Sequence, residues 1–273
     1  MKLYLSFSFS FVVLVMACGD DHNRHQADAP VQTADAPAID APPGATVGYG
    51  RVLVQGFTAP TAQTSMQSLF YTPSPYGAPV IEGPCEVTTH ATGGTPMLVN
   101  AGDLTLTIGS QVLSAPAATN GQYTMPSTSS LLFAGGETVQ LHATGATVPS
   151  FDASVTAPAT SVITQPATQT TIQVDHTMPL SFAWTGGTGS VLLAMYDSTA
   201  NVEMRCYLPA GPGSGSIPVN ALAHFPVGTS ATLVFANQIS GTASPAGWAI
   251  DLWVFVDARF ANGTSAQASL QIN

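Results

Sequence analysis

The fold is decided by the stretch Ile250-Asp251-Leu252-Trp253-Val254-Phe255-Val256-Asp257-Ala258-Arg259-Phe260. Every even position in it is apolar, whereas the odd positions carry carboxylates, aromatic rings and an arginine. Side chains alternate between the two faces of a β-strand, so this pattern predicts one long strand with a continuous apolar face. Trp253 and Phe255 lie on the opposite face, which would ordinarily be solvated.

Shorter segments of the same kind predict further strands. They are rich in β-branched residues and mostly alternate between apolar and polar positions, at residues 51–55, 104–108, 138–141, 180–184 and 231–235. Glycine-rich turns separate them, and only residues 219–225, between Pro218 and Pro226, are typical of a helical turn. We therefore expect an all-β protein made of antiparallel β-sandwiches.

The folded part is long enough for two domains of ordinary size. The segment 156–166 is rich in Ala, Pro and Thr, which places a boundary near residue 158. We expect two tandem β-sandwich domains, one over residues 48–158 and one over residues 159–273.

The second sandwich is expected to be immunoglobulin- or fibronectin-like. Trp184 shares strand parity with Leu180 and Phe182, and one large aromatic side chain in the core is typical of that class. An alternative role for Trp184 is a platform on which a sugar stacks.

The N-terminus carries a lipoprotein signal. An apolar run over residues 3–15 is too short to span a membrane comfortably, and small and apolar residues precede Cys18. We expect residues 1–17 to be removed and Cys18 to carry acyl chains, more than one of which anchors a protein firmly. The alternative is an ordinary secretory leader beside a coincidental cysteine. By resemblance to bacterial sorting rules, Gly19 implies the outer membrane.

Residues 18–47 are of a different kind. They repeat Asp-Ala-Pro at 28–30, 35–37 and 40–42 and contain few bulky apolar residues. Such a segment cannot bury enough apolar surface to fold, and proline with repeated aspartate keeps it extended. We expect a disordered tether that holds the folded part away from the membrane.

Charged residues are scarce. They make up 7% of the chain, which has a formal net charge of −10 and only five Lys and Arg residues. A surface that neutralises phosphates needs clustered Lys and Arg. Nucleic acid is therefore excluded as a partner.

The sequence lacks motifs that carry catalysis or metal binding. Gly-x-Ser-x-Gly and Cys-x-x-Cys are absent, and the histidines are scattered singly. The run at residues 185–190 has the glycines of a phosphate loop but neither its lysine nor its following helix. We expect no enzymatic activity, no cofactor and no resident metal. The alternative is a secreted hydrolase whose site has no recognisable signature.

Two cysteines remain besides Cys18. Cys85 and Cys206 would lie in a compartment that permits disulfides, and their pairing would close a loop of about 120 residues and join the two expected domains. The alternative is that each is a small buried apolar side chain.

The candidate ligand surface is formed by Trp253 and Phe255, with Trp248 extending it from the turn before the strand. Aromatic rings beside carboxylates suit sugar stacking combined with hydrogen bonds to hydroxyls. The alternative is that this face packs against the other domain or a long loop.

Several features together carry a resemblance: the lipobox before Cys18, the Asp-Ala-Pro tether, the phrases Phe133-Ala134-Gly135-Gly136-Glu137 and Val148-Pro149-Ser150-Phe151, and Cys206 ahead of 213–218. The chain resembles the surface lipoproteins of myxobacteria and their relatives. The resemblance implies a membrane-anchored protein of β-sandwiches and supplies no catalytic residues. We expect a non-enzymatic binding or adhesion protein at the bacterial outer membrane, with a glycan or another surface protein as partner. A carbohydrate-binding module is the first alternative.

Overall fold

The computed structural model describes residues 47–58, 62–72, 79–89, 97–117, 121–125, 127–168, 171–197 and 202–273. The expected leader, Cys18 and the tether as far as residue 46 lie outside the described residues.

Most of the described chain is in β-strands and the turns that join them, so the all-β prediction is confirmed. Within these ranges, helical structure is confined to α1 (Val219–Leu222), which falls in the predicted helical turn, and to the 3-10 turn η1 (Pro245–Gly247). Neither α1 nor η1, the helical segments of the described chain, is long and apolar enough to span a membrane.

The largest sheet has twelve strands. Nine of them follow one another in the order β3-β4-β15-β14-β17-β18-β1-β2-β5, while β8 pairs with β2, and β12 pairs with β20, which pairs with β17. Their bounds are β1 (Gly48–Phe57), β2 (Gln63–Thr72), β3 (Val80–Glu82), β4 (Cys85–Thr89), β5 (Met97–Leu98), β8 (Gln122–Met125), β12 (Thr171–Val174), β14 (Ser190–Asp197), β15 (Val202–Pro209), β17 (Ser230–Ala243), β18 (Trp248–Asp257) and β20 (Gln267–Ile272).

Two four-stranded sheets cover this large sheet. The first covering sheet, in the order β10-β9-β6-β7, contains β6 (Leu104–Ile108), β7 (Gln111–Ala115), β9 (Thr138–Ala143) and β10 (Phe151–Thr156). The second covering sheet, in the order β16-β13-β11-β19, contains β11 (Ser161–Gln165), β13 (Leu180–Gly186), β16 (Ser214–Ile217) and β19 (Arg259–Phe260). The described strands pair antiparallel, apart from the parallel pairs β1–β18, β11–β19 and β12–β20.

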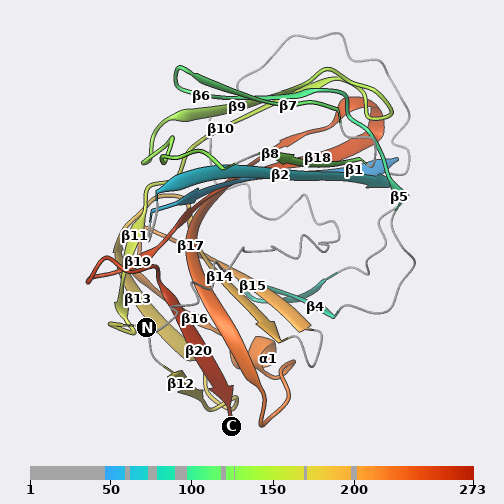
Figure 1. The fold of residues 1–273 in the computed structure, drawn as a ribbon. Helices are drawn as coiled ribbons and strands as arrows, with labels where there is room; N and C mark the ends of the chain where they lie inside the picture. The colour runs from blue at the N-terminus through green and yellow to red at the C-terminus, as the bar shows by residue number, and fades with distance from the viewer. Residues whose placement is uncertain are drawn as a thin grey trace, which may run out of the picture.

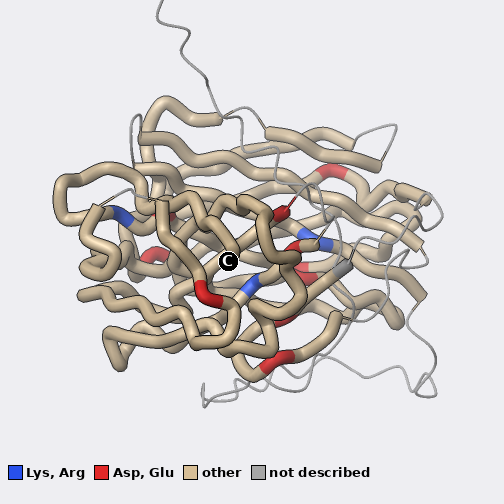
Figure 2. Tube along the Cα trace, turned by 90° about the horizontal axis from the view of Figure 1, so that it is seen from below, with Lys and Arg blue, Asp and Glu red and all other residues tan. Residues whose placement is uncertain are grey.

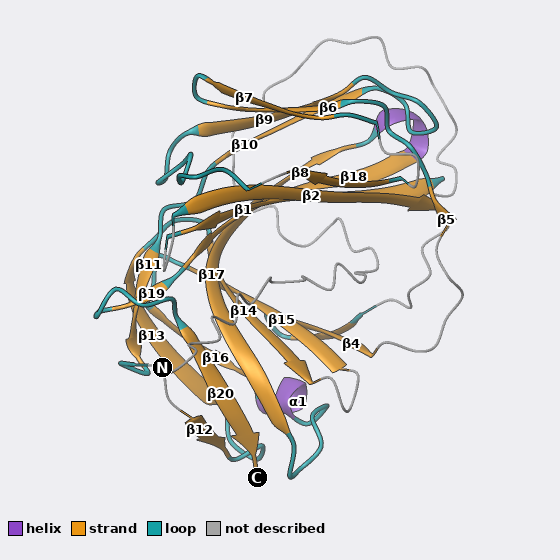
Figure 3. Ribbon diagram, viewed as in Figure 1, coloured by secondary structure: helices purple, strands orange, loops and turns teal. Residues whose placement is uncertain are grey.

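The large sheet bends at β17, so that its two halves face each other (Figures 1 and 3). The first covering sheet lies outside the half that contains β1, β2 and β18, and the second lies outside the half that contains β14 and β15. The molecule is therefore a pair of sandwiches that share one sheet. We call the inner surface of the bend, between the two halves, the concave face.

The first core lies between the first covering sheet and β1, β2 and β18. The even positions of β18 point into it, beginning with Trp248. Gly48 lies opposite Trp248 in the parallel register, and a Cβ at Gly48 would come within 2.5 Å of the indole ring, so this position requires glycine. The other buried members include Val52, Val54, Phe70, Leu104, Leu106, Leu141, Leu252 and Val254.

The second core lies between the second covering sheet and β14, β15 and the first half of β17. Phe182 and Trp184 are each 2% exposed there, as the strand parity predicts, and Trp184 Nε1 donates a hydrogen bond to the Ala210 carbonyl at 2.8 Å. Because this bond satisfies the one polar group of the indole, Trp184 is buried without leaving an unpaired donor. It also favours the structural role of Trp184 over that of a sugar platform.

The predicted boundary near residue 158 falls between β10 and β11, and thus between the two covering sheets. It does not divide the large sheet. β1 precedes the boundary and pairs with β18, and β4 precedes it and pairs with β15. The ranges 48–158 and 159–273 therefore each contribute strands to both sandwiches, because pairing across about 200 residues leaves no mark on local periodicity.

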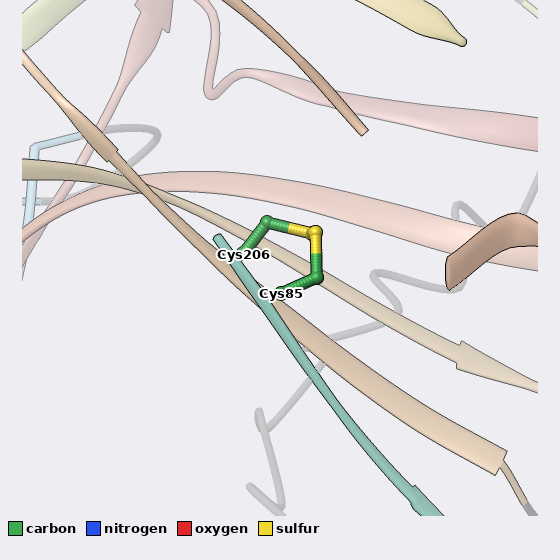
Figure 4. The surroundings of a disulfide bond; sticks show 2 residues. All are labelled: Cys85 and Cys206. Carbon is green, nitrogen blue, oxygen red and sulfur yellow. A yellow bond between two sulfur atoms is a disulfide. The ribbon is translucent and has the colours of Figure 1, made fainter. Parts of the chain in front are cut away.

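Cys85 and Cys206 form a disulfide at the directly opposed position of β4 and β15, and both are fully buried in the second core (Figure 4). The bond fastens an early segment of the chain to the strands that follow residue 158. Its sequence separation is 121 residues, so it removes much of the freedom of the unfolded chain.

We expect the Cys85→Ala/Cys206→Ala double variant to lose about 2 to 4 kcal/mol of unfolding free energy, because the loop it opens is long. Urea unfolding followed by circular dichroism measures the loss. Dithiothreitol should destabilise the wild type by a similar amount and leave the double variant unchanged. Equal stability of the wild type with and without reductant would contradict the expectation.

Candidate functional site

The concave face carries an aromatic cluster that belongs to neither core. Trp253 and Phe255, on the odd face of β18, pack with Leu53 of β1 and Leu192 of β14. Ala194, Tyr207 and Ala236 border this cluster. Residues from opposite halves of the bent sheet thus meet here, and bending of the sheet is what brings them together.

Strand register explains how the cluster forms. In the parallel β1–β18 pair, Leu53 lies beside Trp253 and Gln55 lies beside Phe255. Even positions of these two strands fill the first core, so their odd positions must point to the concave face. Across the bend, β15 places Tyr207 with its ring edge-on to Trp253, at a centroid distance of 6.4 Å.

Two arginines approach Trp253. The guanidinium of Arg51 lies over the indole ring at 3.9 Å from its centroid, and that of Arg205 lies at 5.4 Å. Both distances permit cation–π attraction, which strengthens when the groups are shielded from water. Charged residues are sparse over the described chain (Figure 2), so two arginines against one ring concentrate much of its positive charge.

The two arginines differ in how closely they are paired. An Nη of Arg205 lies 2.5 Å from Glu203 Oε1. Arg51 lies 4.0 Å from Asp251 Oδ2, which is an ion pair beyond hydrogen-bond distance. The Nε of Arg51 is buried and has no hydrogen-bond partner among the described residues.

Asp257 closes one end of the site through a polar network. Its Oδ1 accepts hydrogen bonds from the Thr58 amide at 2.8 Å and from the Thr58 hydroxyl at 2.6 Å, and its Oδ2 accepts one from the Ser265 hydroxyl at 2.8 Å. Arg259 Nε in turn donates to Thr58 Oγ1. Both carboxylate oxygens of Asp257 are thereby occupied.

These groups enclose a pocket of about 120 Å³, which we call the concave pocket. Its wall is mostly apolar, and two arginines and two carboxylates are among the residues that line it. It is lined by Arg51, Leu53, Gln55, Gly56, Phe57, Leu192, Ala194, Glu203, Arg205, Val234, Phe235, Ala236, Trp253, Phe255 and Asp257. A preformed apolar hollow with a few polar groups is the usual form of a small-molecule site.

Of the three aromatic residues expected to form one surface, two are brought together and one is not. Trp253 and Phe255 line the concave pocket, but they are only 8% and 9% exposed. The extension by Trp248 is wrong, because an even position on β18 places its ring in the first core. The sequence analysis did not predict Arg51, Arg205 or Leu192 as site residues. The two arginines could have been recognised, because an arginine inside a strand is unusual in a chain with so few charged residues.

The described histidines, His142, His176 and His224, do not gather into a site. His142 Nδ1 lies 2.8 Å from Asp152 Oδ1 on the exposed side of the first covering sheet, and His224 Nε2 lies 3.7 Å from Glu82 Oε1. Over the described ranges, no cluster of three His, Cys, Asp or Glu residues is arranged to hold a metal ion.

No protein-family model and no curated protein matches the sequence. Among solved structures, the chain is similar to a Ca²⁺-stabilised adhesin that helps an Antarctic bacterium bind ice, at 12% identity over 79% of this chain and 50% of that one, with a TM-score of 0.21. It is also similar to a 1.5-MDa bacterial ice-binding adhesin, at 12% identity over 82% of this chain and 66% of that one, with a TM-score of 0.20. The chain thus spans half to two thirds of these structures, and TM-scores this low carry no inference about function.

We expect Trp253→Ala to lower the free energy of unfolding by about 3 kcal/mol, because it removes a buried ring that both halves of the sheet contact. Trp253→Phe keeps a ring under Arg51 and should cost about 1 kcal/mol. Urea unfolding followed by far-ultraviolet circular dichroism measures both. A loss below about 0.5 kcal/mol for Trp253→Ala would show that the cluster does not hold the two halves together.

Proposed function

We propose that the protein is a non-enzymatic binding or adhesion module of the bacterial cell surface that takes a small apolar group into the concave pocket. The observation that carries the proposal is the pocket itself, a preformed and mostly apolar hollow whose lining includes two buried arginines. Hollows of this kind serve recognition, since few residues fix the orientation of a ligand that apolar burial retains. The fold supplies the wall from five strands distant in sequence.

Sugar stacking on Trp253 is less well supported. A stacking platform needs an open ring face, whereas Arg51 lies over this indole at 3.9 Å and the side chain is 8% exposed. Phe255 and Tyr207 meet the same ring edge-on. This crowding favours an apolar group that inserts beside the rings. It disfavours a pyranose, which would have to lie flat on one ring face.

Membrane attachment is the second part of the proposal. It rests on the lipobox before Cys18 and on the acidic, proline-rich tether, which would keep the folded part at a distance from the membrane. An anchored module would thereby be free to meet ligands outside the cell.

The concave pocket should bind fluorobenzene, a neutral apolar probe, because its volume of about 120 Å³ is close to the roughly 150 Å³ of a dry cavity that accommodates benzene, and it is partly open to solvent. Ligand-observed ¹⁹F nuclear magnetic resonance measures the affinity. Ala194→Phe places a ring in the pocket from β14 without entering either core, and should abolish binding. Ala117→Phe adds the same ring at an exposed position beyond β7 and should leave binding unchanged. The proposal would be refuted if the wild type bound neither fluorobenzene nor the aliphatic probes hexanoate, hexan-1-ol and hexylamine.

Cys18 should carry acyl chains in the mature protein. Mass spectrometry of the N-terminal peptide from membrane fractions is expected to show a diacyl or triacyl mass on Cys18, and Cys18→Ala should release the protein from the membrane, because more than one chain is needed for firm anchoring. An unmodified N-terminus and a soluble wild type would remove the anchor and leave a secreted binding protein.

A further inference from the structure

We propose that the concave pocket binds a free short-chain organic carboxylate, with the carboxylate group on Arg51 and the alkyl tail among the apolar wall residues. The inference rests on the proposed function and adds the chemical class of the ligand.

Arg51 is the group that requires an anion. Arg51 is 5% exposed, its Nε is buried without a hydrogen-bond partner among the described residues, and the carboxylate with which it forms an ion pair, that of Asp251, lies 4.0 Å away. A buried donor without an acceptor costs free energy, and a buried cation costs more. A ligand carboxylate beside the guanidinium would compensate this charge through a charge-assisted bond, for which the planar guanidinium is geometrically suited.

The second arginine of the pocket is more closely paired. Glu203 lies 2.5 Å from an Nη of Arg205 through one of its oxygens, Oε1, and Asp257 accepts hydrogen bonds on both oxygens from Thr58 and Ser265. Arg51 is therefore the less closely compensated of the two arginines that line the pocket. A ligand amine would meet this charge and be repelled.

The size of the pocket sets the length of the tail. Its volume of about 120 Å³ is slightly below the 150 Å³ or so that holds benzene, which allows a tail of about five carbons. Leu53, Leu192 and Ala194 offer that tail an apolar wall without hydrogen-bonding groups. Hexanoate has the matching length.

The test compares hexanoate, hexan-1-ol and hexylamine, which share a tail and differ in charge, by ligand-observed nuclear magnetic resonance on the wild type. Hexanoate should bind about tenfold more tightly than hexylamine or better, with the alcohol between them. Arg51→Gln should weaken hexanoate about tenfold and leave the alcohol unchanged. Ala117→Phe, at an exposed position beyond β7, should leave hexanoate binding unchanged.

The outcomes separate the two proposals. Equal affinity of the wild type for the three probes would overturn the carboxylate inference, while fluorobenzene binding would still support the pocket as a binding site. Failure of all four probes would refute the proposed function as well. If Arg51→Gln does not fold, the probe series on the wild type decides alone, and Ala194→Phe must abolish hexanoate binding for the site to be the concave pocket.

Discussion

The architecture depends on one strand that belongs to both sandwiches. Along β17 the same face points outward throughout, so that Leu233 and Phe235 enter the second core while Ile239 packs against the first. Between them Asn237 is fully buried, its Oδ1 accepting a hydrogen bond from the Ser161 amide at 2.7 Å and its Nδ2 donating to the Thr188 carbonyl at 3.3 Å. An apolar side chain here would leave buried backbone groups without partners, so the amide fixes the place where the covering sheets meet.

Close packing at that place explains the glycines of residues 185–190, whose spacing is similar to that of a phosphate loop. A Cβ at Gly187 would overlap Ser161 Oγ, and one at Gly189 would overlap the Gln238 carbonyl, while both glycines have positive φ. The glycines therefore let the turn between β13 and β14 lie directly on β17. The strand that follows this turn, β14, carries Leu192, which packs in one cluster with Trp253.

Alternation along 250–260 predicted a strand with one wholly apolar face. In the structure this face contributes to both cores, because Leu252 and Val254 fill the first core, whereas Ala258 and Phe260 fill the second. Local pattern thus determined which face of each strand is buried, and placed Trp253 and Phe255 on the other one. It did not reveal that β1 pairs with β18, because pairing partners are chosen by long-range packing that single strands do not encode. For the same reason, the sequence predicted two aromatic residues of the concave pocket, Trp253 and Phe255, but not the arginines beside them.

Stability alone does not account for those arginines. Burying a guanidinium removes its hydration, and a well-packed apolar residue of similar volume is often as stabilising as a buried ion pair. The described chain contains three Lys and Arg residues, which are Arg51, Arg205 and Arg259. The first two are buried against one ring, that of Trp253, in a pocket whose wall is mostly apolar. Arg205 is compensated by Glu203 at contact distance, whereas Arg51 retains a buried donor. The burial of this charge is costly, and an anion bound in the concave pocket, as we propose, would offset part of that cost.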